Sequence, residues 1–431
     1  MLDRFFHLTA HATTPRREVM AGLSTFLTMS FIIAVNPAIL SDAGIDFAAA
    51  FVATIIATII GTLVMGLYAG WPVAVAPGMG LNAFFTYVVV LGYGFTWQQG
   101  LTAVFVSSVL FFIFSITKLR VWLLQSVPSA LQAGITAGIG LFLAMIGLTS
   151  AGIIVSNPDT IVALGPVTKP EFLLAVAGLL IIAALEYRKV PGGILLGILL
   201  LSIIGWGTNM AGLAGIVSAP PVASAAFQLD FSAVTSPAFL SIVFVMLFVD
   251  FFDTTGTLTA IADISGKRQK DGSITNIDKA VVADTSASIV GALAGTSNMT
   301  TYLESAAGIK AGGRTGLTAV VIALLFASCL FFEPLFSSIP VFATAPALIY
   351  VAANFMTSLS SVQWDDMAES LAVMAIAIIM PLTFSIAAGI AFGFIIYGFM
   401  KLVAGKRHEL SSGFGVIVLL AFGWLALSAA G

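Results

Sequence analysis

Long apolar stretches alternate with short polar connections over almost the whole chain of 431 residues. About 20 apolar residues form a helix long enough to cross the hydrocarbon core of a bilayer. The pattern therefore predicts an all-α polytopic membrane protein with fourteen spans, in two groups of seven separated by a polar linker at 207–237. The expected spans lie near 19–41, 47–69, 72–92, 97–117, 128–149, 170–186 and 191–206, and then near 238–262, 278–295, 297–312, 314–333, 340–357, 366–381 and 383–404.

One apolar segment, at 413–430, is left over after the fourteenth span, inside a C-terminal tail at 405–431. Its length fits either a fifteenth span or a re-entrant segment. The sequence leaves these two alternatives open.

The composition agrees with a membrane protein and excludes several other classes. Hydrophobic residues make up 59% of the chain and charged residues only 9%, whereas a soluble domain carries roughly 25% charged residues. The small net charge of -3 gives no basis for binding nucleic acid. The one cysteine, Cys329, and three histidines in polar tails or loops provide no metal site. We expect no cofactor, and no nucleophile–base pair indicates an enzyme.

The positive charges predict the orientation in the cell membrane. With the N-terminus in the cytoplasm, nearly all Lys and Arg residues fall in cytoplasmic connections, and only Lys169 falls outside. This distribution follows the positive-inside rule and is independent of hydropathy. We therefore expect an integral protein of the cell membrane with a cytoplasmic N-terminus. The cytoplasmic charges are Arg4, Arg16, Arg17, Lys118, Arg120, Arg188, Lys189, Lys267, Arg268, Lys270, Lys279, Lys310, Arg314, Lys401, Lys406 and Arg407.

Short sequence matches relate the first half, 1–206, to the second half, 238–404. Gly100–Val104 recurs as Gly316–Val320, and Ser126–Pro128 recurs in similar form as Ser338–Pro340, in the same order. Seven spans are an odd number, so the second copy must enter the membrane from the opposite side. The pattern predicts an inverted repeat, which is typical of secondary transporters with a site near the membrane midplane.

Two of the expected spans are interrupted at corresponding places. The third begins with Pro72, Pro77 and Gly78, and the tenth begins with a polar run at 295–304. Interrupted spans at matching positions of two repeats indicate a transport site. We expect a short extended segment followed by a half-helix in each, at about 72–77 and 297–303.

Four acidic residues are expected inside the membrane, where ionised carboxylates are costly and mark function. They are Asp250 and Asp253 in the eighth span, Asp284 in the ninth, and Glu304 at the break of the tenth. Asp250 and Asp253 are three residues apart and share a helix face. Two close buried carboxylates favour proton binding, so Asp253, Asp250 and Asp284 are the candidates for proton coupling. Asp284 fits equally well a role in fastening helices together.

The substrate candidates are side chains that can pair with the edge of a heterocycle. Glu304 can accept hydrogen bonds from ring N–H groups, and the amide of Asn82 offers both a donor and an acceptor. Capping of the short helix is the alternative for Glu304, and a bond between helices is the alternative for Asn82. The predicted substrate-binding residues are Glu304, Asp250, Asp253, Asn82, Thr301 and Ser305.

The run Thr301–Val320 resembles the signature of the AzgA-like purine permeases, a branch of the nucleobase–ascorbate transporter superfamily. Phe252–Leu258, Pro77–Phe84 and Asn36-Pro37 resemble further motifs of that family, in the same order along nearly the whole chain. The resemblance implies a fold of seven-plus-seven inverted repeats and cotransport of a purine nucleobase with protons. It also implies substrate contacts at Asp250 or Asp253, at Glu304 and at Asn82.

The resemblance further implies a core domain and a gate domain. Many relatives of this fold are expected to dimerise through the gate, and the sequence leaves the oligomeric state of this chain open. We expect the core at 19–117 plus 238–333 and the gate at 128–206 plus 340–404, because the latter spans carry no carboxylate inside the membrane. An anion transporter of the sulfate-permease type is the main alternative on the same fold, although carboxylates would repel its substrate. A passive channel and a membrane enzyme are weaker alternatives, and the preferred purine stays open.

Overall fold

The computed structural model describes residues 2–117, 122, 126–269 and 272–430. Lys118, Arg120 and Lys270, which were counted among the cytoplasmic charges, lie outside this range. The described elements are α1 (Leu2–Phe6), α2 (Pro15–Met29), α3 (Ile32–Asp42), α4 (Phe47–Val64), η1 (Met65–Ala69), β1 (Val75–Pro77), α5 (Met79–Ala83), η2 (Phe84–Val90), α6 (Trp97–Ser115), α8 (Ser129–Ser150), β2 (Ile154–Asn157), β3 (Ile161–Leu164), α9 (Pro170–Tyr187), α10 (Gly193–Gly207), α11 (Pro237–Ser265), α12 (Ile277–Ala294), β4 (Met299–Thr301), α13 (Ser305–Lys310), α14 (Gly316–Cys329), η3 (Leu330–Phe332), α15 (Glu333–Ser337), α16 (Val341–Phe355), η4 (Met356–Ser361), α17 (Met367–Thr383), α18 (Ile386–Val403), η5 (Arg407–Glu409) and α19 (Ser412–Ala430).

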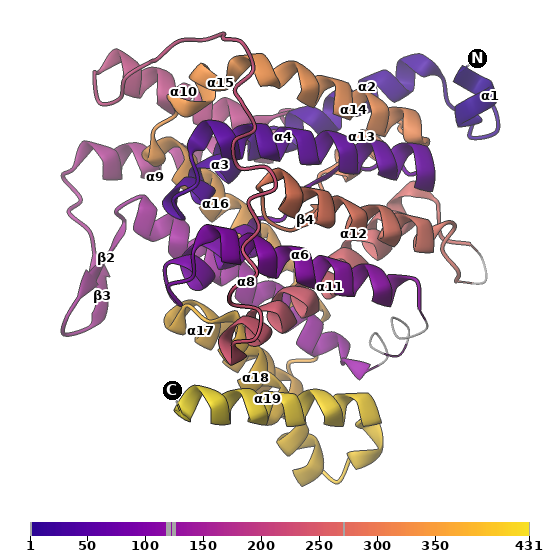
Figure 1. The fold of residues 1–431 in the computed structure, drawn as a ribbon, viewed down its shortest axis with the longest axis vertical. Coiled ribbons are helices and arrows are strands. Elements are labelled where there is room, and N and C mark those ends of the chain that lie inside the picture. The colour runs from indigo at the N-terminus through magenta and orange to yellow at the C-terminus, as the bar shows by residue number, and fades with distance from the viewer. Residues whose placement is uncertain (1, 118–121, 123–125, 270–271, 431) are drawn as a thin grey trace.

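Each of the fourteen expected spans coincides with a helix or with a strand that leads into one. Among the described residues, nine helical segments are long and apolar enough to cross a membrane, and four shorter apolar helices accompany them. The linker between α10 and α11 contains no helix and runs across the bundle as a long trace (Figure 1). A feature that the sequence did not predict is the β2–β3 hairpin between α8 and α9.

The first span is also broken, which the sequence did not predict. Its helix ends at Met29, and α3 begins at Ile32. Pro37 lies inside α3, where its ring removes one backbone donor and disfavours a straight helix. This break places α3 beside α5 and β1, so the first span contributes to the centre of the molecule.

The two extended segments predicted for the third and tenth spans are confirmed as β1 and β4. They pair with each other in an antiparallel two-stranded sheet, and β1 leads into α5 while β4 leads into α13. The register places Val75 opposite Thr301, Ala76 opposite Thr300 and Pro77 opposite Met299.

The hydrogen bonds around this strand pair show the symmetry of the inverted repeat. The backbone N–H of Gly78 donates to the carbonyl of Asn298 at 2.9 Å. The N–H of Tyr302 donates to the carbonyl of Ala74 at 3.0 Å, which is the same bond after exchange of the two strands. A local twofold axis therefore passes through the middle of the pair.

One hydroxyl from an equivalent helix in each half holds each strand. Thr62 of α4 accepts from the N–H of Val75 at 3.0 Å and donates to its carbonyl at 3.1 Å. Ser288 of α12 accepts from the N–H of Met299 at 3.0 Å and donates to its carbonyl at 2.8 Å. Because Val75 and Met299 are equivalent positions, the same twofold relation extends from the strands to the second and ninth spans.

The helices pack in two groups. α12 contacts α4 and α6, and α14 contacts α2 and α4, while α8 contacts α16 and α17, and α17 packs along α18. This packing supports the predicted division into a core and a gate, whose boundaries stay a prediction.

The backbones of α14 and the η1 segment meet at a pair of glycines. A Cβ atom built at Gly316 would overlap the carbonyl oxygen of Gly66, and one built at Gly66 would lie 2.7 Å from the carbonyl oxygen of Gly316. Small residues permit this kind of close approach between membrane helices. The contact joins the two repeats, because η1 belongs to the first half and α14 to the second.

We predict that Gly316→Ala destabilises the protein, because backbone atoms cannot move aside as a flexible side chain can. Overpacking of this kind costs about 1–3 kcal/mol. Thermal unfolding of the purified protein in detergent measures the effect. Gly415→Ala is the matched control, because a Cβ atom at Gly415 in α19 would have no neighbour within 4 Å. Equal melting temperatures for the two variants would contradict the prediction.

The helix α19 runs antiparallel to α18. Near its start, Phe414 stacks on Phe394 and contacts Tyr397, with ring centroids 5.5 Å apart in each case. Near its end, Trp424 lines a small cavity together with Ser385 and Ala387 at the start of α18. The chain therefore returns along α18, and Figure 1 shows the C-terminus on the opposite side of the bundle from the N-terminus. Of the two alternatives, the structure favours a fifteenth span.

A buried lysine holds the loop before α19 in place. Lys401, in the last turn of α18, donates to Asp366 at 3.0 Å and to Glu409 at 2.7 Å. These hydrogen bonds to Lys401 hold the pKa of Asp366 and that of Glu409 below their ordinary values. The start of α17, the end of α18 and the loop before α19 are thereby joined.

We predict that labelling from the two sides of the membrane will distinguish the two ends of α19. In a background with Cys329 replaced by serine, His408→Cys should react with an impermeant thiol reagent from the side of the N-terminus. Ala426→Cys should react from the opposite side only. Labelling of both cysteines from one side would show that α19 does not cross.

Candidate functional site

The middle of α11 faces β4 and the residue that precedes it. The side-chain amide of Asn298 donates to Asp250 Oδ2 at 3.2 Å, and the hydroxyl of Thr300 donates to Asp253 Oδ2 at 3.1 Å. Asp250 is buried and Asp253 is partly exposed. The two aspartates that share a face of the eighth span therefore meet the broken tenth span.

Asp284 of α12 is fully hydrogen-bonded inside the protein. Thr254 of α11 donates to one of its oxygens and Thr301 of β4 to the other, each at 2.6 Å. This buried carboxylate fastens three elements together, which agrees with the structural alternative for Asp284. The hydroxyl of Thr301 is used in the same contact, so substrate binding by Thr301 stays a prediction.

Asn82 of α5 belongs to a buried network of amides and hydroxyls. Its amide donates to Asn36 of α3, and Ser297 donates to its side-chain oxygen. Asn36 in turn donates to Thr54 of α4 at 2.6 Å and to Thr296 at 3.0 Å. Since Asn82 uses both its donor and its acceptor in this network, the structure gives it the role of joining helices. Its predicted contact with substrate stays a prediction.

Glu304 occupies the position before the first residue of α13, yet its carboxylate makes no capping hydrogen bond. The capping alternative therefore does not describe this structure. The side chain is partly exposed, and Asp253 is near enough to interact with it electrostatically. Both carboxylates are accessible from outside the protein core.

Ser305 and Tyr302 hold the third span against the tenth. The hydroxyl of Ser305 accepts from the N–H of Ala74 at 3.1 Å, and the hydroxyl of Tyr302 donates to the carbonyl of Pro77 at 2.7 Å. Both side chains therefore position β1 beside Glu304. Substrate binding by Ser305 stays a prediction.

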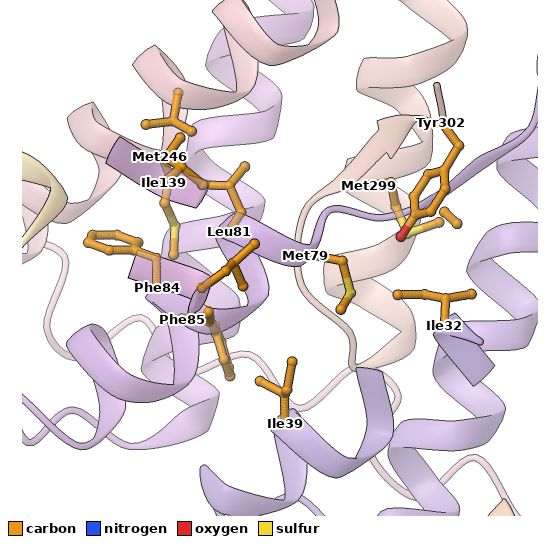
Figure 2. Packing of buried hydrophobic residues seen from close by; sticks show 14 of the residues in the cluster. Ile32, Ile39, Met79, Leu81, Phe84, Phe85, Ile139, Met246, Met299 and Tyr302 are labelled. Carbon is orange, nitrogen blue, oxygen red and sulfur yellow. The ribbon is translucent and has the colours of Figure 1, made fainter. Parts of the chain in front are cut away.

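Apolar side chains surround the strand pair. Figure 2 shows Met79 beside Met299 and Tyr302, and Leu81, Phe84 and Phe85 on the other side of Met79. These residues are at most 5% exposed. Phe84 and Phe85 therefore pack in the core.

Three buried polar residues were missed as candidates. Glu18 of α2 is fully buried and accepts from the N–H groups of Arg314, Thr315 and Thr318 and from the hydroxyl of Thr318. Asn36 and Asn298 are also fully buried. The sequence does contain one signal that Glu18 belongs to a helix and not to a tail. Thr14 and Pro15 are a typical helix start, and they place Glu18 in the first turn of α2.

Glu18 fastens the two halves of the chain to each other. Its carboxylate satisfies the free N–H groups at the beginning of α14, as a capping side chain does. A Cβ atom at Gly308 of α13 would overlap Thr25 of α2, so α2 also lies close against α13. The helix that follows Glu304 is therefore held by the first span.

The charge of the site is acidic. Asp250, Asp253, Asp284 and Glu304 meet there, and the elements packed against the centre of α11 carry only two described cationic side chains, Lys279 and Lys310, both exposed. This arrangement can bind neutral or cationic molecules with N–H donors and repels anions.

Residues 16–392 match the sequence model of the Permease family. Adenine permease AdeP of Escherichia coli (strain K12) is 42% identical over 421 residues, which cover 97% of this chain and 95% of AdeP. Guanine/hypoxanthine permease PbuO of Bacillus subtilis (strain 168) is 42% identical over 426 residues, which cover 97% of this chain and 98% of PbuO.

Among solved structures, the transmembrane domain of a cyanobacterium bicarbonate transporter, BicA, superposes with a TM-score of 0.65. The match covers 88% of this chain and 97% of that domain at 17% identity, so it concerns the fold alone. That fold is the seven-plus-seven inverted repeat, which confirms the predicted architecture. The family match and the two relatives show a membrane permease and not an enzyme. The chain belongs to the permease family of the nucleobase–ascorbate transporters.

Proposed function

We propose that this protein imports purine nucleobases together with protons, by exposing one site alternately to the two sides of the cell membrane. The observation that carries the proposal is the acidic, partly open pair of Asp253 and Glu304 at the broken tenth span, with no described cationic side chain beside it. Purine bases are uncharged heterocycles whose ring N–H groups can donate hydrogen bonds to carboxylate oxygens. The names of AdeP and PbuO support this substrate class.

Anion transport, the second candidate, is supported only by the fold that the protein shares with a bicarbonate transporter. The site argues against it. Carboxylates of the same sign as the substrate raise its free energy in a low-dielectric site, and no basic side chain of the described residues offsets them. Fold alone does not determine substrate.

Protons are the proposed coupling ion because the site holds several carboxylates without cationic partners among the described residues. Protonation removes a charge that is costly inside the membrane. Binding of the base and of the proton then favour each other, which is reciprocal coupling. In this proposal, Glu304 and one aspartate of α11 hold the polar edge of the base, and the other aspartate of the Asp250/Asp253 pair takes the proton.

Uptake of labelled adenine, hypoxanthine and guanine into cells that lack their own purine permeases tests the proposal. We expect accumulation of at least one base, abolished by a proton uncoupler. AdeP and PbuO are each 42% identical to this chain, so sequence identity does not favour one purine over another. Uptake of all three bases must therefore be compared. Uptake of sulfate or bicarbonate without uptake of any base would overturn the proposal.

The proposal also includes the orientation and the assembly of the protein. The N-terminus lies in the cytoplasm, and the protein forms a homodimer surrounded by membrane lipid.

A further inference from the structure

Asp250 and Asn298 form a sealed pair in which each side chain has an unused acceptor. Asp250 is 1% exposed and Asn298 is 0% exposed. The Asn298 amide donates to Asp250 Oδ2 at 3.2 Å. Ser288 of α12 also faces Asp250, but its hydroxyl donates to the carbonyl of Met299 at 2.8 Å, so Asp250 Oδ1 and Asn298 Oδ1 have no hydrogen-bond donor among the described residues. A buried acceptor without a donor is costly, and more so when it belongs to a charged group. The pair therefore lacks one proton donor.

The other carboxylates of the site differ from Asp250. Both oxygens of Asp284 accept hydroxyl protons from threonines at 2.6 Å. Asp253 accepts from Thr300 at 3.1 Å and is partly exposed, as is Glu304. Asp250 alone among the four combines an unused oxygen with complete burial.

The ionisable groups around Asp250 are mostly acidic. Asp284 on α12 and Asp253 on the same helix disfavour a further negative charge on Asp250. The other ionisable groups of this region are Glu304 before α13 and Tyr302 after β4. The elements α5, α6 and α8, which also pack against α11, bring no ionisable side chain. Lys279 and Lys310, on α12 and α13, are exposed at helix ends away from the strand pair.

We propose that the Asp250–Asn298 pair is the binding site of the coupling proton, separate from the surface of Asp253 and Glu304 that contacts the base. This inference rests on the proposed function and divides its site in two. A proton on Asp250 supplies the donor that the pair lacks. Sodium is a poorer occupant, because a hard metal cation requires several more oxygen ligands than the two that are unused.

The amide of Asn298 suits both protonation states. When Asp250 is ionised, the Asn298 NH₂ group donates to it, as the structure shows. When Asp250 is protonated, rotation of the amide brings the Asn298 oxygen to accept the new O–H. Only the O–H bond of Asp250 forms or breaks, and the proton comes from water on one side of the membrane and leaves on the other.

The backbone of Asn298 connects the protonation of Asp250 to the site that binds the base. Its carbonyl accepts from the N–H of Gly78 at 2.9 Å, and its neighbour Met299 begins β4, which ends three residues before Glu304. A change at the Asn298 side chain therefore reaches both strands of the pair. This connection gives the proton an effect on Glu304 without direct contact.

Transport by the full chain in proteoliposomes tests the proposal, with labelled adenine and hypoxanthine as probes. We expect Asp250→Asn to exchange the base across the membrane within about threefold of the parent rate, because the base contacts remain. It should no longer accumulate the base when a pH gradient is imposed. Accumulation by Asp250→Asn, or a folded variant that has lost exchange, would overturn the proposal. So would a requirement of the parent for sodium in place of potassium.

Two further variants separate the roles. Asp263→Asn, at the exposed end of the same helix, is the matched control and should behave as the parent. Asn298→Ala removes the donor that stabilises ionised Asp250, so the pH profile of uptake should move to higher pH while exchange persists. An unchanged profile would contradict the role of Asn298 and thereby the proposed pair.

Infrared spectroscopy of the purified protein tests proton binding independently of any substrate. The carbonyl stretch of a protonated, buried carboxyl group should be present in the parent and in Asp253→Asn, and absent from Asp250→Asn. A band that persists in Asp250→Asn would overturn the assignment. If the parent transports neither base but shows this band, the proposed function fails while the proton site stands.

Discussion

Glu304→Gln should lower the kcat/KM for base uptake by roughly 30- to 150-fold, equivalent to about 2–3 kcal/mol for the loss of a hydrogen bond to a charged acceptor. Glu304 is partly exposed and makes no capping hydrogen bond, so its oxygens are free to accept N–H groups of the base. The glutamine side chain has the same size, but it replaces one acceptor oxygen with an NH₂ donor. A ring N–H that faces this group loses its partner.

The loss is measured as the initial rate of adenine or hypoxanthine uptake over a range of concentrations. Glu171→Gln in the first turn of α9 is the control, because that glutamate is exposed and lies in the other group of helices. The two variants should show equal amounts of protein in the membrane. If Glu304→Gln takes up the base as well as Glu171→Gln does, Glu304 does not bind it.

The spans could be predicted because hydrophobic length is a local property of the sequence. Each apolar run of about 20 residues forms a helix in lipid, whatever its neighbours are. The breaks at β1 and β4 were also predictable, because Pro72, Pro77 and the polar run at 295–304 disfavour continuous helix at those positions. The break at Ser30 in the first span was missed, because the nearest such residue, Pro37, lies seven residues later, inside α3.

The partners of the polar side chains could not be predicted, because they depend on how the two repeats meet. Asn298 looked like one polar residue among several in the tenth span, and only the packing of β4 against α11 brings it to Asp250. Glu18 follows Arg16 and Arg17, so it resembled part of a solvated tail. Its burial becomes clear only when α14, three hundred residues later in the chain, presents its N–H groups.

The roles of the carboxylates were only partly predictable for the same reason. The sequence places Asp250 and Asp253 on one helix face but does not say which of them reaches the surface. The sequence supported two roles for Asp284 equally, proton coupling and the joining of helices. The structure shows that Thr254 and Thr301 donate hydrogen bonds to its two oxygens, which favours the second role. Burial and hydrogen-bond partners separate residues that hydropathy treats alike.

Asp253→Asn should weaken binding of the base and leave proton coupling intact. Thr300 holds one oxygen of Asp253 at 3.1 Å, and the side chain is partly exposed, so the other oxygen can accept from the base. Loss of a charged acceptor predicts a rise in KM of roughly 10- to 100-fold. At saturating base, the variant should still accumulate it in response to a pH gradient, because Asp250 remains.

Thr300→Val tests the same contact from its other side. Without the hydroxyl, the carboxylate of Asp253 loses the donor that orients it, and KM should rise by a smaller factor, about three- to tenfold, as expected for one hydrogen bond of about 1 kcal/mol. Asp365→Asn, which changes an exposed aspartate before α17, should leave KM as it is in the parent. Since Asp253→Asn and Thr300→Val remove the same interaction, their double variant should be no worse than Asp253→Asn alone. An unchanged KM in Asp253→Asn, together with lost accumulation, would instead make Asp253 the proton carrier and Asp250 the residue that binds the base.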